Sequence, residues 1–188
     1  MDPDVAAVIE ELDAHRERYV SFCRSLSEEQ LVRAVPRSSW VVRDFVAHLG
    51  TIDGPVGGMF QGMHGVKATG FGAAAAGIDP WNDAQVAERR TWPLERVIEE
   101  MAETRAVLRG HLAALTAEDL QKAMAFGGDS KRAASSVRLV DYLRGWNKHD
   151  PMHVVDMVRA LPEAVTPELE AWFDDPAIRG YQAAMNRD

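Results

Sequence analysis

Residues 38–49 read Ser38-Ser39-Trp40-Val41-Val42-Arg43-Asp44-Phe45-Val46-Ala47-His48-Leu49. Apolar residues recur in this stretch at the three- and four-residue spacing of an amphipathic helix, which buries one of its faces. Ser39 precedes the apolar series and is of a type that caps helix N-termini. We therefore predict a long helix that begins near Ser39, its N-cap, and carries an apolar stripe to about Ile52.

The same helical spacing recurs along most of the chain, whereas strand-like alternation is scarce. It predicts three further long helices, at about residues 5–26, 93–115 and 137–146. Pro93 suits the first position of a helix, and Ser136 suits an N-cap. Four long helices around one core predict an all-α fold, a four-helix bundle with short helical connections.

Two short segments with capping-box spacing resemble each other, Leu26-Ser27-Glu28-Glu29-Gln30-Leu31 and Leu115-Thr116-Ala117-Glu118-Asp119-Leu120. Residues 39–46 also resemble residues 136–143. Each half of the chain would then be a long helix, a short capped turn and a second long helix. This weak repeat predicts that the helices bearing His48 and His149 face each other across a pseudo-two-fold axis.

Length and composition indicate one globular domain over residues 1–188, with its core at about 5–160. The chain has 188 residues, of which 46% are hydrophobic and 27% charged. Pro162 and Pro167 end the regular pattern, and a C-terminal tail is expected to pack back on the bundle. The net charge of −8 argues against a nucleic-acid partner, which requires clustered Lys and Arg.

Several features favour a cytoplasmic protein with no membrane association. The N-terminus does not resemble a signal peptide, and no apolar run approaches the roughly 20 residues that span a bilayer. Cys23 is the only cysteine, so no intrachain disulfide can form. It lies on the apolar stripe of the first predicted helix, which favours an inert core thiol over a reactive one.

The stretch Gly50–Gly77 contains nine of the fourteen glycines. Because glycine weakens helices, the helix that carries His48 is expected to fray or end after Ile52. The stretch can be read as a connection that covers one end of the bundle, or as a lid over a site. Its small residues also permit a homodimer.

Three histidines have the spacing of a metal site. His149 and His153 are four residues apart, so on a helix both can reach one ion. His48, flanked by apolar residues on another helix, can supply the third imidazole. Three imidazoles leave coordination positions open to water or substrate, which suits catalysis better than structure. The sequence therefore predicts a metal site at His48, His149 and His153.

Pro151 leaves two geometries open for this pair. Inside a helix it would remove a hydrogen bond and kink the chain. Alternatively, Asp150 and Pro151 form the N-cap and first position of a new helix, which leaves His149 outside it. Asp150, like Asp44, can either orient an imidazole or serve as a helix cap or surface charge. For Asp44 we favour a helix cap or surface charge over a role beside the imidazole.

The other histidines, His15, His64 and His111, have no partner at ligand spacing and are expected to be structural or surface residues. His15 lies in a charged run of the first helix, which predicts a solvent-facing side chain.

At these residues the chain resembles the DinB/YfiT-like superfamily of bacterial four-helix-bundle proteins. The resemblance covers about residues 5–160 and rests on Leu-Ser-Glu-Glu-Gln-Leu, Trp40-x2-Arg43-Asp44-x3-His48-Leu49 and Trp146-x2-His149-Asp150-x2-His153. The related mycothiol-dependent maleylpyruvate isomerases carry Glu where this chain has His149, which places the chain nearer the three-histidine branch.

The resemblance implies a divalent metal, often zinc or nickel, at His48, His149 and His153, and thiol-dependent S-transferase, isomerase or hydrolase chemistry. The leading hypothesis is an enzyme that acts on a small-molecule substrate with a metal-activated thiolate from a low-molecular-weight thiol. The alternatives are a metal-dependent hydrolase, a non-catalytic metal- or ligand-binding stress protein, and a purely structural bundle. No catalytic base can be assigned from the sequence.

Overall fold

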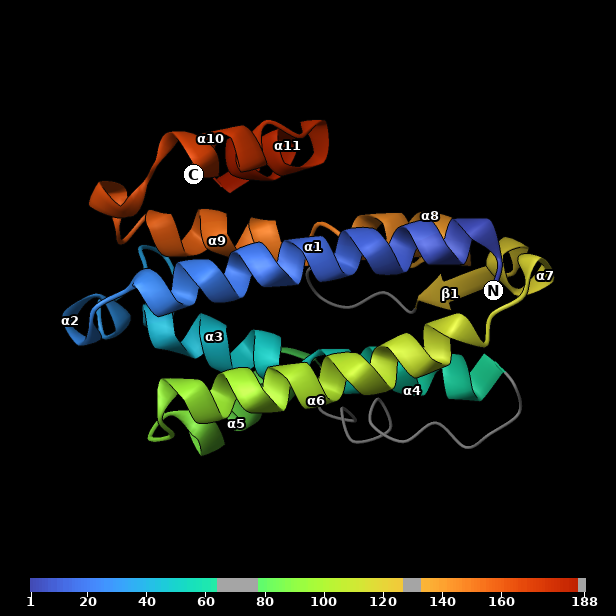
Figure 1. Ribbon diagram of the computed structural model, residues 1–188, viewed down its shortest axis with the longest axis horizontal. Coiled ribbons are helices and arrows are strands. Elements are labelled where there is room, and N and C mark those ends of the chain that lie inside the picture. Colours follow the sequence, from blue (N-terminus) through green and yellow to red (C-terminus); the bar gives the residue numbers. More distant parts are fainter. Residues whose placement is uncertain (64–77, 127–132, 186–188) are drawn as a thin grey trace.

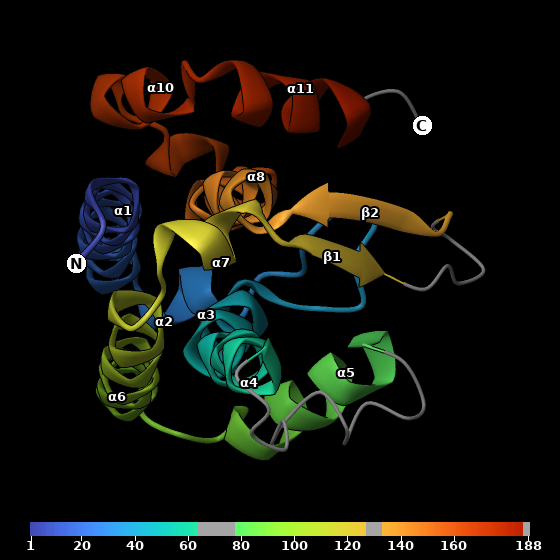
Figure 2. The same ribbon diagram turned by 90° about the vertical axis from the view of Figure 1, so that its right-hand side faces the viewer.

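The computed structural model describes residues 1–63, 78–126 and 133–185 and confirms the predicted all-α fold (Figure 1). The long helices form four rods that run side by side along the bundle (Figure 1 and Figure 2). Two rods are single helices and two are each made of two consecutive helices. The rods are α1 (Pro3–Ser25), α6 (Leu94–Ala113), α3 (Val42–Thr51) with α4 (Asp53–Met63), and α8 (Leu139–Trp146) with α9 (His149–Val158).

The two predicted capping boxes are both present. Ser27 and Gln30 exchange side-chain and backbone hydrogen bonds at the start of α2 (Glu28–Leu31). Thr116 and Asp119 do the same at α7 (Ala117–Gln121). These short helices lie at opposite ends of the bundle, where the chain passes from one rod to another (Figure 1).

The prediction that Ser39 caps the next helix is wrong. The helix α3 begins at Val42, with Val41 as its N-cap residue, and the Asp44 carboxylate accepts a hydrogen bond from the Val41 N–H at 3.1 Å. Ser39 lies in a turn and bend over residues 36–39, which the antiparallel bridge between Ala34 and Val41 closes. Arg37, at the tip of this connection, has a positive φ of 62°. Backbone pairing in the connection thus overrides the capping preference of Ser39.

The glycine-rich stretch does not end the helical rod. The helix α3 ends at Thr51, just before the expected end after Ile52, but α4 follows at once and continues to Met63. Gly57 allows close packing here, because a Cβ atom at this position would lie 3.0 Å from the His111 ring of α6. The proposed lid falls mainly on residues 64–77, which lie outside the described residues, as does His64.

The sequence did not predict α5 (Ile78–Arg89), which packs against α3. Pro93 is the N-cap residue of α6 and not its first helical residue. Ser136 is not a cap either, because it lies in β2 (Ser135–Arg138), which pairs antiparallel with β1 (Ala123–Phe126). In this pairing Ser136 lies opposite Ala125, and α8 begins only at Leu139, after the ladder ends.

The rod that carries His149 and His153 is interrupted before them. The helix α8 ends at Trp146, and α9 begins with His149 as its first residue. Pro151 is the third residue of α9, where the N–H has no partner inside the helix, so the proline costs no hydrogen bond. The backbone ladder starts with the Met152 N–H, which donates to the Lys148 carbonyl at 3.0 Å. Both histidines therefore lie on one regular helix.

The C-terminal tail packs on the bundle as predicted. It forms the short 3-10 helix η2 (Pro162–Ala164), α10 (Pro167–Phe173) and α11 (Pro176–Met185), which pack on α9 (Figure 1). Trp172, Phe173 and Ile178 are buried in the core. Among the described helices, none is both long and apolar enough to cross a membrane.

The apolar core consists of two clusters. Each rod carries one buried charged residue at the level between the two clusters. These residues are Arg16 on α1, Asp53 on α4, Arg105 on α6 and Asp150 on α9. Arg16 Nε lies 2.7 Å from Asp150 Oδ2, and Arg105 Nε lies 2.7 Å from Asp53 Oδ2. Further ion pairs join Arg16 to Asp53 and Arg105 to Asp150 at 3.4 and 3.7 Å. We call these four residues the ion quartet.

Candidate metal centre

His48 lies near the end of α3, and its side chain is almost fully buried, with 4% of the residue exposed. The ring centroid of Trp40 lies 5.2 Å from that of His48. Within the described part of the chain, His48 Nδ1 is buried and has no hydrogen-bond partner. A buried ring nitrogen in this state is an unsatisfied polar atom, which a folded protein tolerates only where something else satisfies it.

His149 and His153 lie one helical turn apart on α9, and their Nε2 atoms are 3.2 Å apart. The His149 ring stacks on Trp146, with centroids 4.4 Å apart and planes inclined by 15°. The His153 ring contacts Phe45 of α3, with centroids 5.5 Å apart. Aromatic side chains from α8 and α3 thus pack against the two rings.

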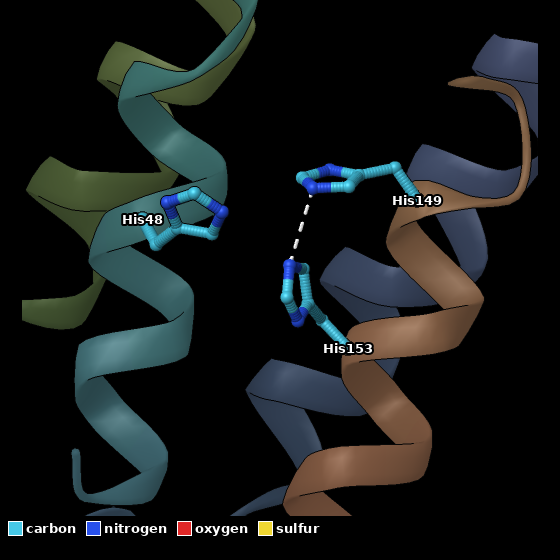
Figure 3. A group of neighbouring side chains, drawn as sticks. All are labelled: His48, His149 and His153. Atoms are coloured by element: carbon cyan, nitrogen blue, oxygen red, sulfur yellow. Dashed lines mark hydrogen bonds between the residues drawn. The ribbon is translucent and has the colours of Figure 1, made fainter. Parts of the chain in front are cut away.

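The structure brings the three predicted residues together. His48 points from α3 toward the other two histidines, which project from α9 (Figure 3). One ring nitrogen from each residue can be chosen so that all three lie within 4.8 Å of one another. The helices that bear these histidines face each other, as the weak sequence repeat predicted.

The three imidazoles fit a divalent metal ion. Zinc–nitrogen bonds of about 2.0–2.1 Å in a tetrahedron place two ligand nitrogens about 3.3 Å apart, close to the 3.2 Å of the His149–His153 pair. Burial lowers the pKa of His48 and of His149 well below the usual range, and nearby histidines lower both further. Both rings are therefore neutral at pH 7, the form that ligates metals.

A family model for the DinB superfamily matches residues 11–157, a range that contains all three histidines. The chain belongs to the DinB superfamily. Neither a curated protein nor a solved structure gave a significant match to the chain. The match itself names neither a reaction nor site residues.

Asp156 orients His153 in this DinB protein, and the sequence analysis missed it. His153 Nδ1 lies 3.0 Å from Asp156 Oδ2, and the Tyr181 hydroxyl donates to the same oxygen at 2.8 Å. A carboxylate on the far nitrogen of a ligating histidine fixes the ring and its tautomer. The i, i+3 spacing of His153 and Asp156 is the local signal that could have indicated this contact.

The two aspartates considered from sequence have other partners. Asp44 caps α3, as favoured, and forms an ion pair with Arg90 at 3.0 Å. The hypothesis that Asp150 orients His149 is wrong, because Asp150 belongs to the ion quartet and is bonded to Arg16. Burial raises the pKa of Asp150, but the charges of Arg16 and Arg105 outweigh it and hold that pKa below its usual value.

The remaining histidines that the structure describes lie outside the cluster. His15 is not solvent-facing as predicted: its side chain is 12% exposed, and its Nδ1 accepts a hydrogen bond from Trp172 Nε1 at 2.7 Å. The tail covers this position, which the sequence of the first helix alone does not reveal. His111 of α6 packs beside Gly57 of α4. Cys23 is buried, as expected, and burial raises its pKa to about 12.

Proposed function

We propose that this DinB protein is a metal-dependent enzyme whose divalent ion, zinc or nickel, is bound by His48, His149 and His153. The observation that carries the proposal is the convergence of three ring nitrogens within 4.8 Å from two helices. A structural zinc site normally has four protein ligands, whereas three leave a position for substrate. The burial of His48 and the neutral state of its ring support the same interpretation.

We propose thiol-dependent S-transfer as the reaction. A divalent ion at this site lowers the pKa of a low-molecular-weight thiol and so favours its thiolate. The thiol loses its proton to solvent, its sulfur forms a bond to an electrophilic carbon, and the leaving group departs with the bonding electron pair. The nucleophile comes from the cosubstrate, because Cys23 is the only cysteine and its thiol is buried and protonated.

The chain's own residues have separate parts in this scheme. Asp156 and Tyr181 fix the orientation of His153. Trp146 stacks on His149, and Trp40 packs on His48, so both rings have a defined position.

Metal content and turnover test this proposal. The purified protein is expected to bind zinc or nickel with a stoichiometry of one, and His48→Ala to lose this binding. His111→Ala, a histidine outside the cluster, is the matched control and should bind metal like the wild type. Bacillithiol, mycothiol and glutathione are then screened against a panel of electrophiles with each protein.

The expected result is conjugation by the wild type and His111→Ala, and loss of at least 100-fold in rate for His48→Ala, as when a metal's full catalytic contribution is removed. Absence of metal binding by the wild type contradicts the whole proposal. Metal binding with equal rates for all three proteins contradicts S-transfer and leaves a metal-binding protein.

A further inference from the structure

A cavity of about 360 Å³ lies beside the histidine cluster. Its walls come from the connection before α3, from α5, from α9 and from α11. Three lining residues also contact the cluster: Trp40 packs on His48, Phe45 packs on His153, and Asp156 is bonded to His153. The cavity therefore shares a wall with the candidate metal centre, and its volume is within the range of small-molecule sites.

The C-terminal tail forms one wall of this cavity. Tyr181 and Met185 of α11 line the cavity, whereas the match to the DinB family model ends at residue 157. Arg37 Nη1 donates to the Met185 carbonyl at 3.0 Å and so joins the tail to the connection before α3. The family-matched bundle supplies the histidines, and the segment after it completes the neighbouring cavity.

Acidic side chains line one part of the cavity. Asp156 is only 4% exposed, and its Oδ1 is buried without a hydrogen-bond partner among the residues that the structure describes. Asp79 and Asp83 line the cavity from α5, and Asp83 accepts a hydrogen bond from Trp40 Nε1 at 2.8 Å. These carboxylates give this part of the cavity a negative charge, which would attract an ammonium group of a ligand. Trp40 adds an aromatic ring, which also attracts cations.

Basic side chains line another part of the cavity. Arg159 reaches the cavity from α9, and in the described ranges it forms no ion pair with an acidic residue. Arg37 lines the cavity from the connection before α3. An arginine without a carboxylate partner in a cavity wall is suited to bind a carboxylate of a ligand by two parallel hydrogen bonds.

We propose that this cavity binds a small molecule that carries both a protonated amine and a carboxylate. The ammonium group lies against Asp83 and Asp156, and the carboxylate lies against Arg159. This inference deepens the proposed function, because it assigns a zwitterionic substrate to the site beside the histidines. The role of the cavity as the substrate site rests on that proposed function. The binding step itself requires no metal.

Calorimetric titration of metal-free protein tests the inference. The probes are S-methylcysteine and S-methylglutathione, which keep both charged groups but have no thiol to bind a metal. At least one is expected to bind with a stoichiometry of one. Its N-acetyl derivative, which lacks the ammonium group, and its methyl ester, which lacks a carboxylate, are expected to bind at least tenfold more weakly.

Matched variants locate the site. Asp83→Asn and Arg159→Gln are each expected to weaken binding of the probe at least tenfold. Asp141→Asn and Arg179→Gln alter charged residues that do not line the cavity, and they should bind like the wild type. No saturable binding of either probe at millimolar concentration overturns the inference, as does binding that is unaffected by Asp83→Asn and Arg159→Gln. Because the titration uses metal-free protein, a failure of the metal proposal leaves this result unchanged.

Discussion

His153 uses both of its ring nitrogens. Its Nδ1 faces the Asp156 carboxylate at 3.0 Å, and its Nε2 lies 3.2 Å from His149 Nε2. When Nδ1–H donates to Asp156, the Nε2 lone pair is left for a metal. The orientation of this ring therefore depends on a carboxylate that does not itself belong to the cluster.

We predict that Asp156→Asn weakens zinc binding about 10- to 100-fold, the usual effect of removing a carboxylate that orients a ligating histidine. The substitution keeps the side-chain shape but removes the charge that favours Nδ1–H. Competition with a chromophoric chelator measures the affinity. Asp141→Asn, which alters an exposed aspartate paired with Arg138, is the control. Equal zinc affinities for the two variants would contradict the role given to Asp156.

Cys23 gives a prediction with a definite pH dependence. The folded protein keeps this thiol protonated because burial raises its pKa to about 12, whereas an unfolded cysteine ionises near pH 8.5. The unfolded state thus loses a proton first, so the free energy of unfolding falls as the pH rises above about 8.5, by up to about 1.4 kcal/mol per pH unit.

Urea unfolding at pH 8 and pH 10 measures this loss, which should be smaller in Cys23→Ala. A thiol reagent at pH 8 should label Cys23 only in urea. Rapid labelling of the native protein would show that the thiol is accessible and refute the assignment of Cys23 to the core.

Local spacing was enough to predict the histidine cluster, because His149 and His153 are neighbours on one helix and His48 lies on an apolar helix face. It was not enough to predict the environment of His15 and Asp156. Both contact the tail, through Trp172 and Tyr181, and such distant contacts leave no periodic signal in either segment.

At the scale of the helices, the ion quartet joins all four rods. We predict that Asp53→Asn costs about 3–5 kcal/mol of stability, because it removes a charge that pairs with both Arg105 and Arg16 in the buried core. Glu95→Gln makes the same chemical change in an exposed pair with Arg24 and should cost much less, because solvent screens exposed ion pairs.

Urea unfolding of the two variants provides the comparison. If Asp53→Asn costs no more than Glu95→Gln, the quartet does not contribute as a buried network.

Helix existence was easier to predict than helix boundaries. Ser39 and Ser136 are both good capping residues, yet each lies in a segment whose backbone pairs with another segment before the helix begins. Pro151 left open whether His149 lies on the same helix as His153. A break between α8 and α9 at residues 147–148 places the proline in the first turn of α9, so both histidines lie on that helix. For Ser39 and Ser136, backbone pairing that local propensity does not reveal decided the boundary.

For the whole molecule, the tail is part of the core and not an appendage. Ile178 of α11 is fully buried against the cluster that includes α3 and α9 residues. We predict that Ile178→Ala costs about 2–5 kcal/mol, the usual range for deleting buried methyl groups. Val107→Ala, at a 57% exposed position of α6, should change stability by no more than about 0.5 kcal/mol.

Thermal or urea unfolding measures both variants. A small effect of Ile178→Ala would mean that α11 is not packed as described, and the cavity wall formed by Tyr181 and Met185 would then be in question.

The bundle and its packed tail were predictable because a buried stripe recurs on each long helix. The division of the core into two clusters was not. Arg16, Asp53 and Arg105 lie in segments of mixed composition, where single charged residues ordinarily face solvent, so only the assembled bundle shows that they meet.

The ion quartet also limits which alignments of the helices are possible. Apolar stripes can pack in several registers, since a shift of one turn exchanges one aliphatic contact for another. A shift of α1 by one turn, about 5.4 Å, would instead separate Arg16 from Asp150 and Asp53 and leave the Arg16 charge buried and unpaired. Asp150 directly follows His149 in the chain. The alignment that pairs these charges therefore also fixes the position of α9 along the bundle axis relative to α3. Replacing all four charges with apolar residues would then preserve or increase stability while allowing slipped packings in which His48 no longer faces His149 and His153.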